Sequence, residues 1–257
     1  MIRTFAICCA ALLAASAPAF GQARSNGRLA SVVDAYEQFS RRVDPLTSSS
    51  EGDRAALRRL PDASRDTELA QRAELVTLRG QLERVPTRGL NDEDTLNRAY
   101  LLRVINQQIE NIDLDFGRAP IGNGDGFFTA GDYLAYNTPI QSADDAEAWI
   151  ARLEALPQYY RQNIANARRG IETGYTQPRI VVDRAIETAR AQLGTLEDTL
   201  LVPFAAMPAN MPAAQQETFR TRARTVIRDQ ILPVHREAVT FLENEYAPAA
   251  RAGLGLR

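Results

Sequence analysis

Apolar residues recur three and four positions apart along most of the chain, which is the period of an amphipathic helix. The expected helices cover about residues 25–42, 64–85, 91–115, 142–174, 178–193 and 219–246. We find no stretch with the two-residue alternation that a half-buried strand requires. The pattern therefore predicts an all-α protein, with seven or eight helices in an irregular bundle.

Prolines and polar residues set the expected ends of these helices. Asp44-Pro45 should end the first helix, because a proline restricts the residue before it, and a polar serine loop should follow. Pro157 should split or kink the helix at 142–174, and Pro233 should kink the last helix. Residues 203–213 contain three prolines and are expected to form a connector.

Residues 117–141 are the one long irregular stretch that the pattern predicts inside the helical domain. A twelve-residue calcium loop with Gly126 at its sixth position would begin at Ile121, which offers no side-chain oxygen, and end at Asp132 in place of glutamate. The glycines are not followed by the Lys-Ser/Thr pair of a phosphate-binding loop. A glycine-rich turn is therefore the favoured interpretation.

Residues 1–23 have the pattern of a secretion signal peptide that is removed from the mature protein. Arg3 is the sole charge before an apolar run, and Gly21 and Ala23 are small residues at the positions that signal cleavage after Ala23 requires. A buried N-terminal helix is the alternative. Residues 24–257 then form the mature helical domain, and the expected location is the periplasm or the extracellular space.

Composition excludes several classes of function. The chain has 30 basic and 32 acidic residues, so it lacks the positive field expected of a nucleic-acid partner. A basic run at Arg220, Arg222, Arg224 and Arg228 is interpreted as a solvated helix face. No second long apolar run follows the signal, so we expect no membrane partner after cleavage.

The sequence offers little catalytic or metal-binding chemistry. Both cysteines, Cys8 and Cys9, lie within the segment to be removed, and His235 is the only histidine. Zinc sites usually combine several such ligands, so His235 is interpreted as a structural residue near the Pro233 kink. The acidic pair Asp144 and Asp145 is explained by its place in a first helical turn. We therefore predict no catalytic, cofactor-binding or metal-ligating residue.

Many short motifs resemble the N-terminal half of the bacterial family called domain of unknown function 885. They are Leu134-Ala135-Tyr136, Thr138-Pro139, Asp145-Ala146-Glu147-Ala148-Trp149, Arg152-Leu153, Leu156-Pro157-Gln158-Tyr159, Arg169-Gly170-Ile171, Gly174, Pro178-Arg179 and Val181-Val182. Further matches are Asp44-Pro45, Gly52-Asp53, Leu60-Pro61-Asp62, Pro233, Phe241-Leu242, Glu245-Tyr246 and Pro248-Ala249-Ala250-Arg251. The resemblance covers most of residues 25–257.

This resemblance implies a largely helical, often exported protein that is similar to zinc metallopeptidases. The His-Glu and Gly-His-His motifs of the family lie in the second half of its members' sequences, and this chain has no counterpart of that half. His235 stands where members of the family tend to have an aromatic residue. Zinc and a peptide substrate are thus implied only for the full-length family. Since the tail Arg251–Arg257 adds no closing element, we expect a chain that ends where its relatives continue.

Three hypotheses remain open at this stage. The first is the inactive helical N-terminal portion of a metallopeptidase-like protein, a scaffold that forms part of a substrate cleft. The second is a complete, stand-alone periplasmic binding or interaction module. The third is a free-standing hydrolase that uses Asp and Glu alone, although no spacing identifies a candidate pair. Whether the chain is an enzyme, its substrate, its oligomeric state and the role of residues 117–141 are left undetermined.

Overall fold

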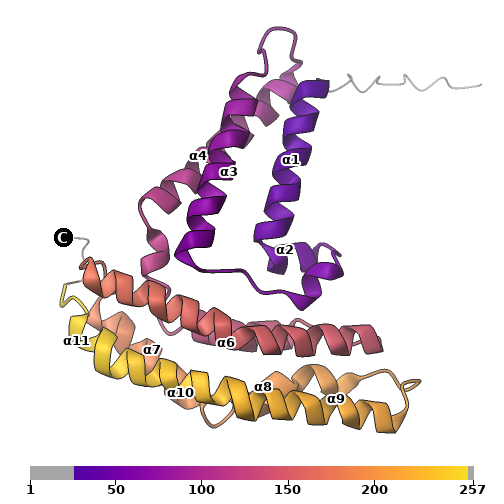
Figure 1. The fold of residues 1–257 in the computed structure, drawn as a ribbon, viewed down its shortest axis with the longest axis vertical. Helices are drawn as coiled ribbons and strands as arrows, with labels where there is room; N and C mark the ends of the chain where they lie inside the picture. The colour runs from indigo at the N-terminus through magenta and orange to yellow at the C-terminus, as the bar shows by residue number, and fades with distance from the viewer. Residues whose placement is uncertain (1–25, 254–257) are drawn as a thin grey trace, which may run out of the picture.

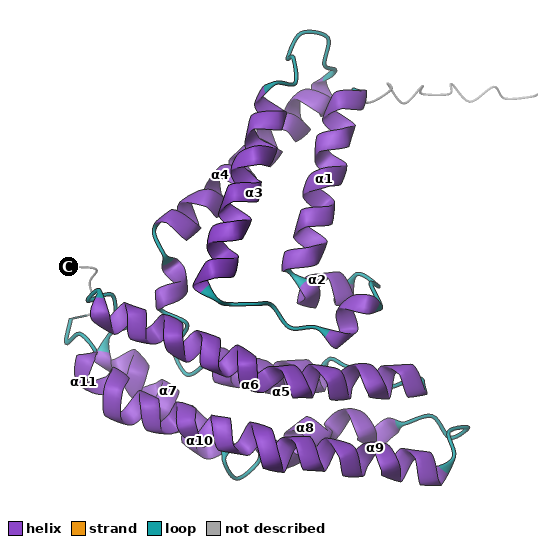
Figure 2. Cartoon of the chain, viewed as in Figure 1, coloured by secondary structure: helices purple, strands orange, loops and turns teal. Residues whose placement is uncertain are grey.

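The computed structural model describes residues 26–253, and their regular structure is helical (Figure 2). The only β contacts within this range are two isolated bridges, between Ile121 and Gly126 and between Pro178 and Arg251. The all-α prediction is confirmed. The signal peptide expected at residues 1–23 lies outside the described residues, as does the end of the tail, residues 254–257.

The first layer of the fold is built from three long helices, which are α1 (Gly27–Val43), α3 (Arg65–Glu83) and α4 (Asp92–Asp113). Their apolar faces enclose a separate core that includes Leu29, Phe39, Leu82 and Ile105. Asn26 begins α1 and Asn91 begins α4, and both accept backbone N–H bonds through their side chains. Polar caps and helical periodicity thus define this layer.

The second layer is a bundle around the thirty-residue helix α6 (Ala143–Glu172). The other helices of this layer are α5 (Ala130–Tyr136), α7 (Arg179–Gln192), α8 (Leu196–Leu201), α9 (Ala213–Val226), α10 (Leu232–Phe241) and α11 (Ala247–Ala249). The larger core of this layer is built on the buried side chains of Trp149, Leu153, Tyr160 and Ile164 from α6. The apolar face of α6 is therefore mostly core.

Two short segments rest on α6 and join the layers (Figure 1). One contains α2 (Pro45–Ser50) and the 3-10 turn η1 (Ala55–Arg58), and the other is the 3-10 turn η2 (Phe116–Arg118). Beside η2, Arg169 of α6 donates two hydrogen bonds of 2.8 Å to the Asp115 carboxylate. Ion pairing therefore fixes the point where α4 meets α6.

Proline is accommodated differently in the two long helices. Pro157 lies inside α6, which continues without interruption, so a split at this position is excluded. Buried side chains on both sides of Pro157 offset the hydrogen bond that the proline cannot donate. Before Pro233, residues Ile227–Ile231 form a π-helical turn, which is wider and makes room for the proline ring. A second π-helical turn, Leu242–Tyr246, precedes Pro248.

Three short helices were not predicted. The segment after Asp44, expected to be a polar loop, forms α2, with Pro45 in its first turn. The Asp44 carboxylate accepts hydrogen bonds from the Thr47 N–H at 3.0 Å and the Thr47 hydroxyl at 2.6 Å. Helices α5 and α8 are similarly short, and α9 begins at Ala213, earlier than expected. Elements this short contain too few turns for a periodic signal.

Residues 117–141 are more ordered than an irregular loop. They contain α5, the 3-10 turn η3 (Phe127–Thr129) and a tight turn closed by the bridge between Ile121 and Gly126. Gly126 has a φ of +154°, and a Cβ there would lie 3.0 Å from the carbonyl oxygen of Pro120. Asp132, the last position of the rejected calcium loop, lies on α5 and accepts a 2.6 Å hydrogen bond from Gln192.

Candidate functional site

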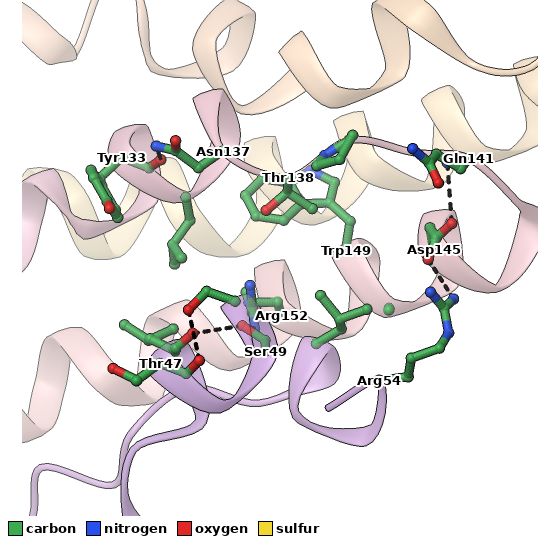
Figure 3. Close-up of a pocket in the computed structure, with 16 residues that line it drawn as sticks. Thr47, Ser49, Arg54, Tyr133, Asn137, Thr138, Gln141, Asp145, Trp149 and Arg152 are labelled. Carbon is green, nitrogen blue, oxygen red and sulfur yellow. Dashed lines mark hydrogen bonds and ion pairs between the residues drawn. The ribbon is translucent and has the colours of Figure 1, made fainter. Parts of the chain in front are cut away.

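A cavity of about 580 Å³ lies where the first layer rests on the bundle. We call it the junction pocket, and it is lined by residues within 46–57, 133–141 and 145–152. Figure 3 shows side chains of α2 and η1 on one side and those of α5 and the following segment on the other. Volumes of 300–1,000 Å³ are typical of small-molecule sites.

The wall formed by α2 and η1 is held by local capping. Asp44 caps α2, and the Asp53 carboxylate accepts hydrogen bonds from the N–H groups of Ala55 and Ala56, at 2.9 and 3.2 Å, to begin η1. The Ser49 hydroxyl donates a 2.8 Å bond to the Leu46 carbonyl. Local capping therefore shapes the two short turns of this wall.

The opposite wall meets α6 at the Ser142 cap. The Ser142 hydroxyl accepts from the Asp145 N–H and donates to the Asp145 carboxylate at 2.8 Å, and that carboxylate also accepts from the Gln141 N–H. Arg54 reaches from the other wall to the same carboxylate at 2.5 Å. The acidic first turn of α6 thus both begins the helix and ties the two walls together.

The charge of Asp145 is stabilised in this position. Burial, the largest influence, raises the pKa of Asp145, but hydrogen bonds from Ser142, Arg54 and the Gln141 N–H together outweigh it, so the pKa lies below its usual value. Its neighbour Asp144 is paired with Arg54 and Arg58. The Asp145 carboxylate therefore remains ionised at neutral pH.

Arg152 is the deepest charged residue of the junction pocket. Only 2% of the residue is exposed. Its guanidinium donates to the backbone carbonyls of Arg59 at 3.2 Å and Ala56 at 2.9 Å, and to the Ser49 hydroxyl at 3.3 Å. All three acceptors are neutral. Burial lowers the pKa of Arg152 to about 10, so the residue remains a cation at neutral pH.

The apolar floor of the pocket belongs to the bundle. Trp149 is 1% exposed, and its indole N–H donates a 3.1 Å bond to the Leu200 carbonyl, which satisfies the only polar atom of the ring. Leu46, Leu57 and Leu134 contribute further apolar surface. The pocket is therefore amphipathic, with a buried cation beside apolar side chains.

His235 lies in the core of the bundle and is fully buried. Its Nε2 lies 2.8 Å from the Ala189 carbonyl oxygen and its Nδ1 lies 3.1 Å from the Tyr160 hydroxyl. Burial lowers the pKa of His235 and raises that of Tyr160. Burial also raises the pKa of Asp132, which belongs to the same polar cluster. These contacts are those of a hydrogen-bonded core histidine.

The arginine run of the last long helix forms ion pairs at the surface. Arg222 contacts Glu147 at 2.6 Å and Arg228 contacts Glu197 at 2.7 Å, while Arg224 pairs with Glu217 on its own helix. These three arginine side chains remain between 39% and 61% exposed. The run is thus a solvated face whose charges are largely paired within the protein.

Two further features of residues 26–253 concern metal ligands and membrane-spanning helices. Nowhere in this range do three or more His, Cys, Asp and Glu side chains gather closely enough to hold a metal ion. The same part of the chain contains no helix with both the length and the apolar character needed to cross a bilayer.

The junction pocket was not predicted from the sequence, although one signal was present. Arg152 lies three residues after Trp149 and directly before Leu153, so a charge interrupts the apolar face of α6. A charged residue on such a face needs internal partners or a ligand. The partners, residues 49–59, are far away in sequence, and only the tertiary structure brings them to α6.

Residues 26–253 place the chain in the class of two-layer, all-helical proteins, with a second layer that is built on one long helix, α6. The family model described as "Bacterial protein of unknown function (DUF885)" matches residues 45–255, and the chain belongs to this family. The resemblance found in the sequence is therefore confirmed.

A solved structure shares this fold. It is titled "The crystal structure of the putative lipoprotein from Colwellia psychrerythraea" and is 13% identical, with a TM-score of 0.77. The match covers 88% of this chain and 42% of the other, so the present chain spans less than half the length of that protein. Comparison with curated proteins gives no match.

Proposed function

We propose that this chain is the helical portion of an exported family protein, that it does not hydrolyse substrate by itself, and that it forms one wall of a substrate cleft. The junction pocket is the observation that carries the proposal, because it combines a concave, partly apolar surface with polar side chains from both layers. The 42% coverage of the structural neighbour is consistent with a portion of a larger assembly.

The chemistry of the described residues supports a role in binding. Zinc-dependent hydrolysis needs ligands that hold the metal and a group that acts on its bound water. His235 is the single imidazole, and both of its ring nitrogens lie within hydrogen-bond distance of other groups. A zinc-dependent reaction, as the family resemblance implies, would draw its ligands from outside this chain.

The proposed location outside the cytoplasm rests on residues 1–23, which carry Arg3, an apolar run and small residues before Arg24. Expression in a bacterial host should yield a processed product whose N-terminal residue is Arg24, as determined by mass spectrometry of the periplasmic fraction. An unprocessed cytoplasmic product would contradict the proposed export.

The lack of hydrolytic activity can be tested directly. The purified protein should hold no stoichiometric zinc after incubation with the metal and dialysis, and it should release no fragments from a mixture of peptides. Metal content by mass spectrometry and peptide analysis by chromatography check both points. Stoichiometric zinc together with zinc-dependent cleavage would overturn the proposal.

A stand-alone binding module is the second candidate, and the two well-formed apolar cores favour it. If this candidate holds, the purified protein should be monodisperse, unfold cooperatively and bind little hydrophobic dye. A scaffold that needs another part should instead expose apolar surface, bind dye and self-associate. Light scattering and dye fluorescence distinguish the two candidates.

A further inference from the structure

The junction pocket contains a positive charge that the protein itself does not neutralise. Its charged lining residues are Arg54, Arg152 and Asp145. Arg54 contacts Asp145 at 2.5 Å and Asp144 at 3.4 Å. Arg152 forms no ion pair within the described residues, although it is almost fully buried. A buried cation usually requires a paired anion, because leaving water costs several kcal/mol.

The hydrogen bonds of Arg152 leave part of its guanidinium available. Its three bonds use Nε and Nη2, and none in the described part of the chain uses Nη1. The guanidinium therefore retains two donor hydrogens on Nη1, and Arg152 lines the cavity. Carboxylates are strong acceptors for such charged donors.

The opposite wall offers neutral polar groups. Thr138 and Gln141 line the pocket, and neither side chain forms a hydrogen bond with another described residue. Figure 3 shows Arg152 between the wall that carries these two residues and the wall that carries Thr47 and Ser49. A bound anion would thus meet a buried cation from α6 and additional donors from the segment after α5.

Apolar surface lies beside these polar groups. Trp149, Leu57 and Leu134 line the same cavity, so a purely inorganic anion would leave this surface uncovered. We therefore propose that the junction pocket binds a small ligand with a carboxylate attached to an apolar group, and that Arg152 is the residue that binds the carboxylate. This inference rests on the proposed binding role of the pocket, and it adds the chemical class of the ligand.

The first experiment compares matched ligands on the unmodified protein. 3-Phenylpropionate carries both required groups, 3-phenylpropionamide lacks the charge, and acetate lacks the ring. Trp149 is the only tryptophan of the chain and lines the pocket, so its fluorescence reports binding. The acid should bind at least tenfold tighter than the amide or acetate. Equal affinities of acid and amide, or no detectable binding of the acid at millimolar concentration, would overturn the inference.

The second experiment changes the residues. Arg152→Met should abolish the preference for the acid over the amide, whereas the control Arg168→Met should preserve it, because Arg168 lies on the same helix but pairs with Glu245 outside the pocket. Arg152→Met also leaves three acceptors without their donor and could prevent folding. Ala148→Asp is a second variant that removes no hydrogen bond and places a carboxylate one helical turn before Arg152, at a buried position that lines the pocket. Circular dichroism checks that each variant is folded.

Ala148→Asp should reduce acid binding at least tenfold and leave amide binding nearly unchanged. An acid preference that persists in either folded variant would exclude Arg152 as the carboxylate-binding residue. These outcomes are separate from those for the proposed function. If the unmodified protein is non-hydrolytic but shows no preference for the acid, only the ligand class is overturned, whereas zinc-dependent peptide cleavage overturns only the non-hydrolytic role.

Discussion

The Asp115 carboxylate joins three segments of the chain, and its removal should weaken the contact between the two layers. Arg169 of α6 binds it with two hydrogen bonds of 2.8 Å, while Arg65 of α3 and Arg118 of η2 lie at 3.2 and 3.3 Å. The Asp115 side chain is 15% exposed. Its φ of +53° is left-handed, a conformation that asparagine also tolerates well. Asp115→Asn therefore removes the charge and keeps the size of the side chain and the backbone conformation.

The magnitude follows from the bonds that are lost. A hydrogen bond to a charged group contributes about 1.5–3 kcal/mol, and the neutral amide retains one acceptor oxygen. We expect Asp115→Asn to lower the free energy of unfolding by about 2 kcal/mol. Asp115→Ala should lower it by about 4 kcal/mol, because it also loses the last acceptor and adds the roughly 1–2 kcal/mol cost of a left-handed alanine.

The effect should depend on pH. Burial, the largest influence, raises the pKa of Asp115, but the Arg169 hydrogen bond and the charges of Arg169, Arg65 and Arg118 together lower it below its usual value. The stabilisation is therefore present above the pKa of the unfolded chain, about 3.9, and is lost as the pH falls through the lower pKa of the folded state. The difference between wild type and Asp115→Asn should shrink in this acidic range.

Urea unfolding, followed by circular dichroism and Trp149 fluorescence at pH 7 and in the acidic range, measures this difference. Asp113→Asn is the matched control, because Asp113 pairs with Arg72 at the exposed surface and should leave the unfolding midpoint unchanged. Equal stability of wild type and Asp115→Asn at pH 7 would refute the reasoning, as would a loss that is independent of pH.

Three further predictions concern packing, capping and protonation. Gly170→Ala places a Cβ 2.5 Å from the Arg118 carbonyl oxygen and should destabilise the folded protein by about 2–3 kcal/mol. Gly80→Ala has open space around the new Cβ and should stabilise the folded protein by up to about 1 kcal/mol. Thermal unfolding compares the two variants. Asp44→Ala removes the α2 cap and should cost about 1 kcal/mol in urea unfolding, unlike Asp44→Asn. Because burial lowers the pKa of His235, the free energy of unfolding should fall as the pH drops below about 6.5. This pH dependence should be absent in His235→Gln. The same pH dependence in both proteins would contradict the role of His235 as a neutral core residue.

The long helices could be predicted from the amino-acid sequence, because each buries one face over several turns and thus repeats its apolar positions. Two of the expected helices start at polar residues, Asn91 and Ser142, and in the structure both side chains accept backbone bonds as helix caps. Pro233 marked the disturbance in the last helix, although its π-helical form did not follow from the pattern. Family membership also followed from short motifs, since these are local.

The short helices and the candidate site depend on contacts between distant parts of the chain, so they could not be predicted. Helix α2 has six residues, too few for a periodic signal, and its stability depends on the Asp44 cap and on contact with the rest of the fold. Arg152 meets Ser49 and Ala56 across about a hundred residues of sequence. Whether such a charge finds a partner depends on how two separately cored layers pack together, and local periodicity carries no information about that packing.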